Sequence, residues 1–404
     1  MTPPMGLAPF APDNTIFKNE TALRDSYRPD ELLERDEELA AYQSALRPVI
    51  NGAQPKNIFL YGETGVGKTL ATRMVLDRLR QDQADYDHLD LHTVNLVCKS
   101  MGSSYQVAVN LVNEFRDLHE EINSTGHPAS DVYNKLWTHL EELDATHCLI
   151  VLDEIDAIGS DDNLLYELPR ANDNGNVEST WVGVIGISND FTFRESLSAR
   201  VTDSLCDEEI HFPPYDANQL RKILTQRSQD AFRDDVLSGD VIPLCAAQTA
   251  QKYGSARQAL KRLYKAGDLA RDEGADEVTE DHIRQADDLV ERDKVQSELS
   301  KLPTQAKIAL YGLLMLDDDG KTPAKRSKIY ERYSIAAKQL GADVVSDRTI
   351  HDNLSQLTLK GFLDVNEQNE GPNGGSYYEY EFSIRPDLAR DVLRHDGRTG
   401  DLWE

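Results

Sequence analysis

The chain has 404 residues, of which 71 are acidic and 43 are lysine or arginine, giving a formal net charge of −28 at pH 7. This length allows two or three domains with separate cores, so disulfide staples are not required. The four cysteines stand apart without a CxxC pair, which argues against a zinc knuckle and for a reducing compartment. The acidity indicates either a surface adapted to molar salt, where the Debye length is about 3 Å, or an ordinary acidic cytosolic protein.

The N-terminal twelve residues contain no basic region followed by an apolar run, and the apolar stretches elsewhere are short. We therefore expect neither a secretory signal nor a membrane-spanning helix. A cytoplasmic protein without a membrane partner is the resulting expectation.

Short apolar runs rich in β-branched residues alternate with helical patterns, which predicts an α/β fold with a parallel sheet covered on both faces. The five predicted strands cover residues 57–61, 92–97, 147–152, 182–188 and 208–212. The connection from the second strand to the third is longer than one crossover helix needs, and it holds two helical patterns, at 106–118 and 131–143. An insertion is therefore expected over residues 99–143.

The second half of the chain changes character after Pro213 and Pro214, where strand signals stop. Helical patterns follow at 218–232, 242–253, 256–271 and 279–293, and then at 304–316, 327–340 and 347–360, before strands expected around 371–375. The first four predict a small helical domain, and the remainder has the order of a winged helix-turn-helix. The expected domains are 1–214, 215–298 and 299–404.

The last helical pattern, 347–360, has two faces. Three apolar residues at helical spacing would bury one side of it. The other side would present Arg348, Ser355 and Gln356, which are candidate DNA-binding residues.

The most basic stretch of the chain leads into the preceding helix. Its candidate DNA contacts are Lys325, Arg326 and Lys328, with Glu331 as the only acid among them. Such a stretch could meet phosphates, or it could be the solvated start of a helix.

Residues 62–69 read GETGVGKT, follow a predicted strand and open a helical pattern, which is the P-loop pattern in its expected context. Backbone N–H groups of such a loop cradle phosphates, while Lys68 reaches the outer phosphates and the Thr69 hydroxyl holds Mg²⁺. ATP and Mg²⁺ are therefore the expected cofactors, and a glycine-rich structural turn is the alternative. The predicted nucleotide contacts of the loop are Gly62, Glu63, Thr64, Gly65, Val66, Gly67, Lys68 and Thr69.

The strand at 147–152 delivers Asp153 and Glu154 to its carboxyl end, where ligands bind in parallel sheets. Asp153 would hold the magnesium through water, and Glu154 would act as the base that orients the attacking water. An acidic strand end is usually a helix cap, but a P-loop one strand position away favours the catalytic interpretation.

The strand at 182–188 ends beside Asn189, a neutral amide that could sense a γ-phosphate or the attacking water. An Asx turn that closes the strand is the open alternative.

Six motifs, in this order, resemble the archaeal origin-recognition and cell-division-control type replication initiators. They are the P-loop, LDEID at 152–156, SND at 188–190, ARV at 199–201, FPPY at 212–215 and GSAR at 254–257. The resemblance implies an AAA+ core, a helical lid and a C-terminal winged helix that binds replication origins. With the acidity, it favours a haloarchaeal source.

The resemblance also implies roles for single residues. Asn189 matches sensor 1, Arg257 matches the sensor 2 arginine of the lid, and Tyr27 and Pro29 match the segment beside the adenine. Arg200 matches the arginine presented to a neighbouring subunit's nucleotide. The insertion matches initiator helices that touch the minor groove, whereas the wing at 369–377 departs from the family because it lacks arginine.

Both arginines also have ordinary alternatives. Arg257 could be solvated lid surface, and Arg200 could pair with Asp203 or Glu195 of its own subunit.

The predicted function is an ATP-switched initiator that binds double-stranded origin DNA, recruits the replicative helicase, self-associates on DNA and hydrolyses ATP slowly. An ATP-dependent transcriptional regulator, a signalling ATPase, or a DNA-binding module with a vestigial ATPase could share this domain order, and fold alone does not separate them. Arg200 and the insertion favour the initiator.

Overall fold

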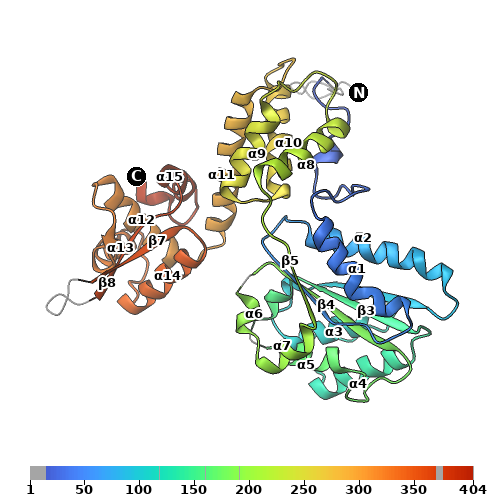
Figure 1. The fold of residues 1–404 in the computed structure, drawn as a ribbon. Helices are drawn as coiled ribbons and strands as arrows, with labels where there is room; N and C mark the ends of the chain where they lie inside the picture. The colour runs from blue at the N-terminus through green and yellow to red at the C-terminus, as the bar shows by residue number, and fades with distance from the viewer. Residues whose placement is uncertain (1–14, 118, 160, 191, 370–375, 404) are drawn as a thin grey trace, which may run out of the picture. The chain divides into compact units, whose positions relative to one another are not determined.

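The computed structural model describes residues 15–117, 119–159, 161–190, 192–369 and 376–403 (Figure 1). The chain divides into two compact units, Met1–Ile283 and Arg284–Glu404. Among the described helices, none has the length and apolar character needed to cross a membrane.

A five-stranded parallel sheet in the order β2-β3-β4-β1-β5 lies at the centre of the first unit. Its strands are β1 (Ile58–Tyr61), β2 (Leu91–Val97), β3 (His147–Asp153), β4 (Trp181–Ser188) and β5 (Glu208–His211). Each end agrees with the predicted strand to within one residue. One prediction was wrong: β4 lies between β1 and β3, so the acidic strand end is two positions from the P-loop strand rather than one. All five carboxyl ends still open on one edge of the sheet.

Helices cover both faces of this sheet, as predicted (Figure 1). One face carries α1 (Asp36–Ile50) and α2 (Lys68–Asp82). Five of the described helices lie on the other side of the sheet. They are α3 (Ser104–Glu114), α4 (Ala129–Glu141), α5 (Asn163–Glu167), the short α6 (Phe193–Ser196) and α7 (Ala199–Leu205). The two helices predicted in the insertion are therefore present, as α3 and α4.

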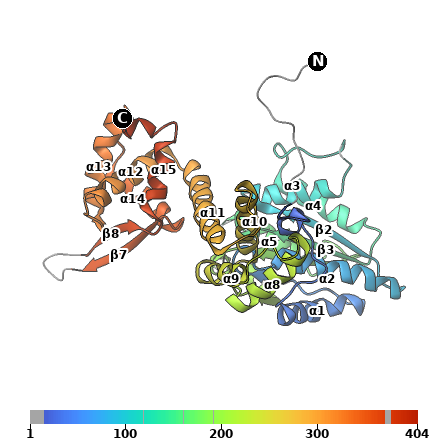
Figure 2. The ribbon, with the colours of Figure 1, turned by 90° about the horizontal axis from the view of Figure 1, so that it is seen from above.

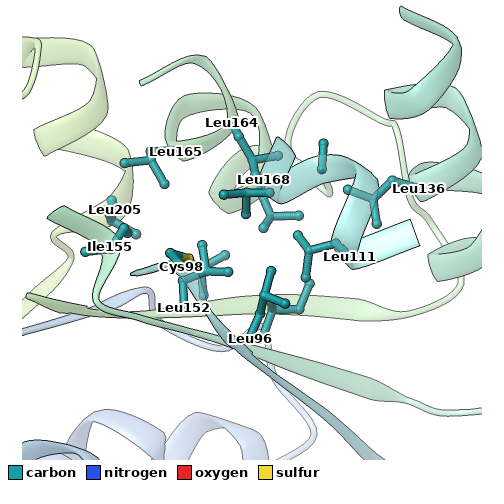
Figure 3. Packing of buried hydrophobic residues seen from close by; sticks show 14 of the residues in the cluster. Leu96, Cys98, Leu111, Leu136, Leu152, Ile155, Leu164, Leu165, Leu168 and Leu205 are labelled. Carbon is teal, nitrogen blue, oxygen red and sulfur yellow. The ribbon is translucent and has the colours of Figure 1, made fainter. Parts of the chain in front are cut away.

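The insertion helices help to form the core. Figure 3 shows Leu96 and Leu152 of the sheet facing Leu111 of α3, Leu136 of α4 and Leu164 of α5. All five side chains are buried. Because buried apolar area is the main stabilising term in folding, this packing fixes the base of the insertion on the core.

The lid consists of α8 (Ala217–Ala231), α9 (Val241–Lys252), α10 (Ala256–Asp272) and the start of α11 (Glu280–Ser300). The segment around Phe17 packs into it. Phe17 forms an isolated β-bridge with Phe232, and its ring lies 4.9 Å from that of Phe232 and 5.6 Å from that of Tyr264. A Cβ at Gly267 of α10 would lie 2.4 Å from Phe17 Cζ. The lid is thus built from two stretches that are distant in sequence.

The helix predicted at 279–293 continues to Ser300, because Val295 and Leu299 keep the apolar spacing and bury in the core of the second unit. The predicted domain limit at residue 298 stays a prediction.

The second unit has the predicted winged-helix order. Its elements are α12 (Thr304–Asp318), β6 (Ala324–Lys325), α13 (Arg326–Gln339), α14 (Asp347–Leu359), β7 (Leu363–Asn369), β8 (Ser376–Phe382) and α15 (Pro386–Arg394). The antiparallel order is β6-β8-β7. Figure 2 shows β7 and β8 side by side next to the helices. Ile350, Leu354 and Leu357 are buried, as the pattern predicted.

Two elements of this unit, the short β6 and the helix α15, were not predicted. The strands expected around 371–375 correspond to β7 and β8 on either side of that stretch, and residues 370–375 themselves lie outside the described residues.

Candidate nucleotide-binding site

The loop between β1 and α2 turns through glycines with positive φ, namely Gly62 at 144°, Gly65 at 79° and Gly67 at 104°. A Cβ at Gly62 would lie 2.3 Å from the carbonyl oxygen of Phe212, so a side chain has no room there. The helix α2 begins at Lys68, and the N–H groups of its first turn have no partner within the helix. This geometry suits an anion such as a phosphate.

Lys68 lies inside the loop with its side chain buried. Its Nζ donates to the carbonyl oxygens of Gly62, at 2.7 Å, and of Glu63, at 2.8 Å. Burial lowers the pKa of Lys68 to about 8, although Asp153 and Asp156 act in the opposite direction. The loop therefore holds a lysine whose charge depends on pH near neutrality.

ATP binding should weaken as the pH rises above about 8, where Lys68 loses its proton in the free protein. Bound phosphates favour the charged ammonium, so binding raises the pKa of Lys68 and takes up a proton. Well above this pKa, affinity should fall about tenfold for each pH unit. Calorimetric titration with ATP at several pH values measures the affinity, and its repetition in buffers of different ionisation enthalpy measures the proton uptake.

The variant Lys68→Arg is the control for this prediction, because a guanidinium stays protonated throughout the range. Any ATP binding that it retains should lack the pH dependence. Equal affinity of the unmodified protein on both sides of this pKa, without proton uptake, would contradict the prediction.

The acidic pair lies at the carboxyl end of β3. Thr69 Oγ1 donates a hydrogen bond of 2.8 Å to Asp153 Oδ2, so the two predicted magnesium ligands are adjacent. Glu154 follows in the left-handed region, with φ 55° and ψ 44°, which turns its side chain away from that of Asp153. Its Oε2 lies 3.8 Å from Nζ of Lys99, the first residue of the predicted insertion.

The hydroxyl and carboxylate oxygens of Thr69 and Asp153 are hard ligands of the kind that Mg²⁺ prefers. Within the described ranges, no cluster of three or more His, Cys, Asp or Glu side chains could hold a metal. Two protein ligands suit Mg²⁺, which usually keeps several waters and also binds substrate phosphates.

Asn189 follows β4 and is held through its backbone. Its N–H donates to Asp156 Oδ1 at 2.9 Å, and the same oxygen accepts from Ser188 Oγ at 3.0 Å. Asp156 therefore fixes the turn that presents Asn189. The sequence analysis assigned no role to Asp156 beyond its place in the motif at 152–156. Its position two residues after Glu154 is the signal that could have identified it.

These residues surround one cavity of about 340 Å³. Its lining includes the P-loop and strand-end residues Gly65, Gly67, Lys68, Thr69, Asp153, Glu154 and Asn189. It also includes the apolar residues Pro29, Leu32, Leu33, Ile223 and Leu260, together with Tyr27. Site residues that were predicted from separate motifs thus line a single cavity that offers polar groups for phosphates and apolar surface for a base.

The lid reaches the P-loop through the start of α10. The Ala256 N–H donates to the Gly65 carbonyl oxygen at 3.1 Å, and Arg257 lines the cavity. Arg257 Nε lies 3.5 Å from Asp25 Oδ1, and its side chain is 53% exposed. The guanidinium is therefore within the pocket and accessible to a ligand.

Three family models match the chain in the order of its domains. They are an AAA domain over residues 52–189, a Cdc6 AAA+ ATPase-type lid domain over 221–288 and a CDC6 C-terminal winged helix domain over 297–392. ORC1-type DNA replication protein 1 of Haloarcula marismortui is 65% identical over 414 residues, which cover 99% of this chain and 97% of that protein. This chain belongs to the ORC1-type DNA replication proteins.

A more distant ORC1-type relative, from Pyrococcus abyssi, is 39% identical over 384 residues, covering 94% of this chain and 90% of that protein. Among solved structures, the Aeropyrum pernix ORC1 protein in complex with DNA has a TM-score of 0.84 at 33% identity, covering 96% of this chain and 100% of that one. The Haloarcula relative agrees with the haloarchaeal source predicted from the resemblance and the acidity. The ORC1-type family also confirms the AAA+ core, lid and winged helix.

In this ORC1-type protein, Arg200 lies near the start of α7 with its side chain 54% exposed. It is 3.8 Å from Asp162 Oδ1 and donates to Asn163 Oδ1 at 3.3 Å. The expected alternative partners were Asp203 and Glu195, but the acid beside it is Asp162, because α5 packs against α7.

The candidate DNA-binding residues lie in the second unit. On α14, Arg348 and Gln356 are exposed and Ser355 is partly exposed, as predicted. The basic stretch is less free than the sequence suggested. Two of its basic side chains already contact acids. Arg326 lies 2.9 Å from Asp347, which is outside the stretch, and Lys328 lies 3.1 Å from Glu331, which is within it.

Lys325 has an aromatic neighbour, with Nζ 3.5 Å from the centre of the Tyr377 ring. The ion pairs of Arg326 and Lys328 are exposed, and such pairs contribute about 0–1 kcal/mol, so a phosphate can displace them.

One buried residue at the site was not predicted to have a role. Arg35 precedes α1, is 1% exposed and bonds to the P-loop. A lone arginine in an acidic sequence has no local signal that distinguishes burial from a solvated surface.

Proposed function

We propose that this ORC1-type protein is an ATP-switched initiator that binds double-stranded origin DNA and recruits the replicative helicase. The observation that carries the proposal is the contact between Thr69 and Asp153, at 2.8 Å, in a cavity shared by the P-loop and the lid. A nucleotide in that cavity would touch both parts, so its phosphates could control how the lid lies on the core.

In this proposal Thr69 and Asp153 hold Mg²⁺, which supplies charge stabilisation at the phosphates when it is bound. Lys68 binds the outer phosphates. Glu154 accepts a proton from the attacking water, and Asn189, held by Asp156, orients that water or the γ-phosphate.

Arg257 would distinguish the nucleotide states from the lid. The γ-phosphate of ATP would compete with Asp25 for its guanidinium and hold α10 against the P-loop. Hydrolysis would remove that phosphate and release the contact. We propose that slow, Mg²⁺-dependent hydrolysis is a timer that ends the active state.

DNA binding is proposed for two regions, by analogy with the Aeropyrum pernix ORC1 protein that was solved with DNA. The first is the domain 299–404, where Arg348, Ser355 and Gln356 of α14 would read bases and Lys325, Arg326 and Lys328 would meet phosphates. The second is the insertion 99–143. We also propose that the protein self-associates on DNA and that it is cytoplasmic. The proposed lid is 215–298, and the core is 1–214.

Mapping of bound DNA across the source genome should show the protein at one or a few replication start regions. The variant Arg348→Ala should lose this preference, because one good bidentate contact with a base contributes about 1–3 kcal/mol of discrimination. Arg390→Ala is the matched control, since Arg390 is a partly exposed arginine of the same unit that pairs with Asp318 outside α14. Binding spread over promoters would instead favour a transcriptional regulator.

A further inference from the structure

Two stretches of chain connect the core with the lid within the first unit. One is residues 28–34, which run from the lid-bound Tyr27 to Arg35 at the start of α1. Tyr27 is bound to the lid through its hydroxyl, which donates to Asp230 at 3.2 Å, and through its ring, which lies 4.0 Å from the Arg227 guanidinium. The other connection is residues 212–216, between β5 and α8. Any movement of the lid must pass through these two connections.

Arg35 joins both connections to the P-loop. Its Nε donates to the Val66 carbonyl oxygen at 3.1 Å, and a terminal nitrogen donates to the Pro213 carbonyl oxygen at 2.5 Å. The other terminal nitrogen donates to Glu38 at 3.0 Å. The guanidinium also lies 3.7 Å from the centre of the Tyr215 ring. Only the planar fork of arginine provides donors in these directions together with a flat face for stacking.

Tyr215 continues the path to the lid. The hydroxyl oxygen of Tyr215 lies close to Gly67, since a Cβ added at Gly67 would be 3.2 Å from that oxygen. The Tyr215 N–H donates to the Gly254 carbonyl oxygen at 2.8 Å, and a Cβ at Gly254 would lie 2.4 Å from Pro214 Cβ. This close packing fixes the turn at Gly254, which lies two residues before the start of α10.

Arg257 lies in the first turn of α10, three residues after Gly254. The contacts therefore run without a gap from the P-loop through Arg35 and Tyr215 to the turn that places Arg257. A buried side chain bonded to each segment leaves little freedom for one to shift without the others.

We propose that Arg35 is a positioning residue that couples the phosphate-binding loop to Arg257, and that it thereby sets the preference for ATP over ADP. The proposal rests on the proposed nucleotide site and on the proposed role of Arg257. Arg35 acts from behind the P-loop, through Val66 and Tyr215. A purely structural arginine would instead stabilise the fold and support the two nucleotides equally.

A double-mutant cycle on the full chain distinguishes these two roles. The dissociation constants of MgATP and of ADP are measured for the unmodified protein, Arg35→Met, Arg257→Ala and the double variant. Each single change should lower the ATP-over-ADP preference, by about 5-fold to 150-fold if the coupling has the usual size. The double variant should show the same preference as Arg257→Ala, because Arg35 acts through Arg257.

Additive losses of preference, or equal losses of ATP and ADP affinity in Arg35→Met, would overturn the proposal. Arg271→Met is the matched control. Arg271 is a largely buried arginine that bonds to Glu20 and Asp268 within the lid, so its loss should leave the preference unchanged.

Tyr215→Leu provides a second test if Arg35→Met does not fold. It removes the ring that Arg35 covers but keeps the N–H that bonds to Gly254, and it should give the same non-additive result with Arg257→Ala. Additivity in this pair would also overturn the proposal. Failure of the unmodified protein to bind ATP would instead refute the proposed function itself.

Discussion

The variant Lys68→Ala should abolish tight ATP binding, whereas Glu154→Gln should bind ATP normally and hydrolyse it far more slowly. Lys68 Nζ lies inside the P-loop, 2.7 Å from the Gly62 carbonyl oxygen, and supplies the side-chain charge for the outer phosphates. Glu154 follows Asp153 in the left-handed backbone region, and its Oε2 lies 3.8 Å from Lys99 Nζ. The loss of a general base typically costs about 10²-fold to 10⁴-fold in rate.

Equilibrium binding of ATP and single-turnover hydrolysis separate these effects. Lys56→Ala is the matched control, because Lys56 is an exposed lysine before β1 that pairs with Glu208. Both activities of this control should match those of the unmodified protein. If Glu154→Gln and Lys68→Ala lose ATP binding equally, the role assigned to Glu154 is wrong.

Replacing Arg200 with alanine should remove ATPase activity that depends on a neighbouring subunit. Its side chain is half exposed on α7, with Asp162 at 3.8 Å, Asn163 as a hydrogen-bond partner and the Tyr166 ring 5.1 Å from its guanidinium. A guanidinium supplied to a transferring phosphoryl group accelerates transfer by about 10³-fold to 10⁵-fold. A monomer should therefore hydrolyse ATP very slowly, and the rate per subunit should rise with protein concentration and with DNA.

Mixing tests whether the arginine acts in trans. Arg200→Ala and Lys68→Ala, each inactive alone, should recover some activity when they are combined on origin DNA, because each supplies what the other lacks. Arg194→Ala is the control, as a partly exposed arginine that pairs with Glu209 in the same region. A rate that stays flat with concentration and DNA, with no recovery in the mixture, would show that Arg200 only bonds to α5.

The sheet and the P-loop could be predicted because their signals are local. A buried parallel strand is a continuous apolar run, and both ends of all five strands were placed to within one residue. The glycines of the P-loop mark positive φ angles directly. Asp153 and Glu154 were identified because a strand end and a carboxylate pair coincide in the sequence.

Strand order was harder to predict, because no local pattern states that β4 lies between β1 and β3. Arg35 and Asp156 depend on contacts between residues far apart in the chain, such as Arg35 with Pro213. The helix α15 did have a signal, in Pro386 at its start and the later apolar residues Leu388 and Leu393. The hairpin of the wing could be predicted because the glycine-rich stretch 371–375 separates its two strands in the sequence.

Because Phe17 packs between Phe232, Tyr264 and Gly267, the helices from α8 onward do not form a complete lid by themselves. A gene fusion that began at α8 would leave the ring of Phe232 exposed and a groove open beside Gly267. Loss of a buried phenylalanine typically costs about 3–5 kcal/mol, which is a large part of the stability of a small domain. The segment that carries Phe17 and the helices of the lid therefore depend on each other for stability, and a substitution in one constrains the other.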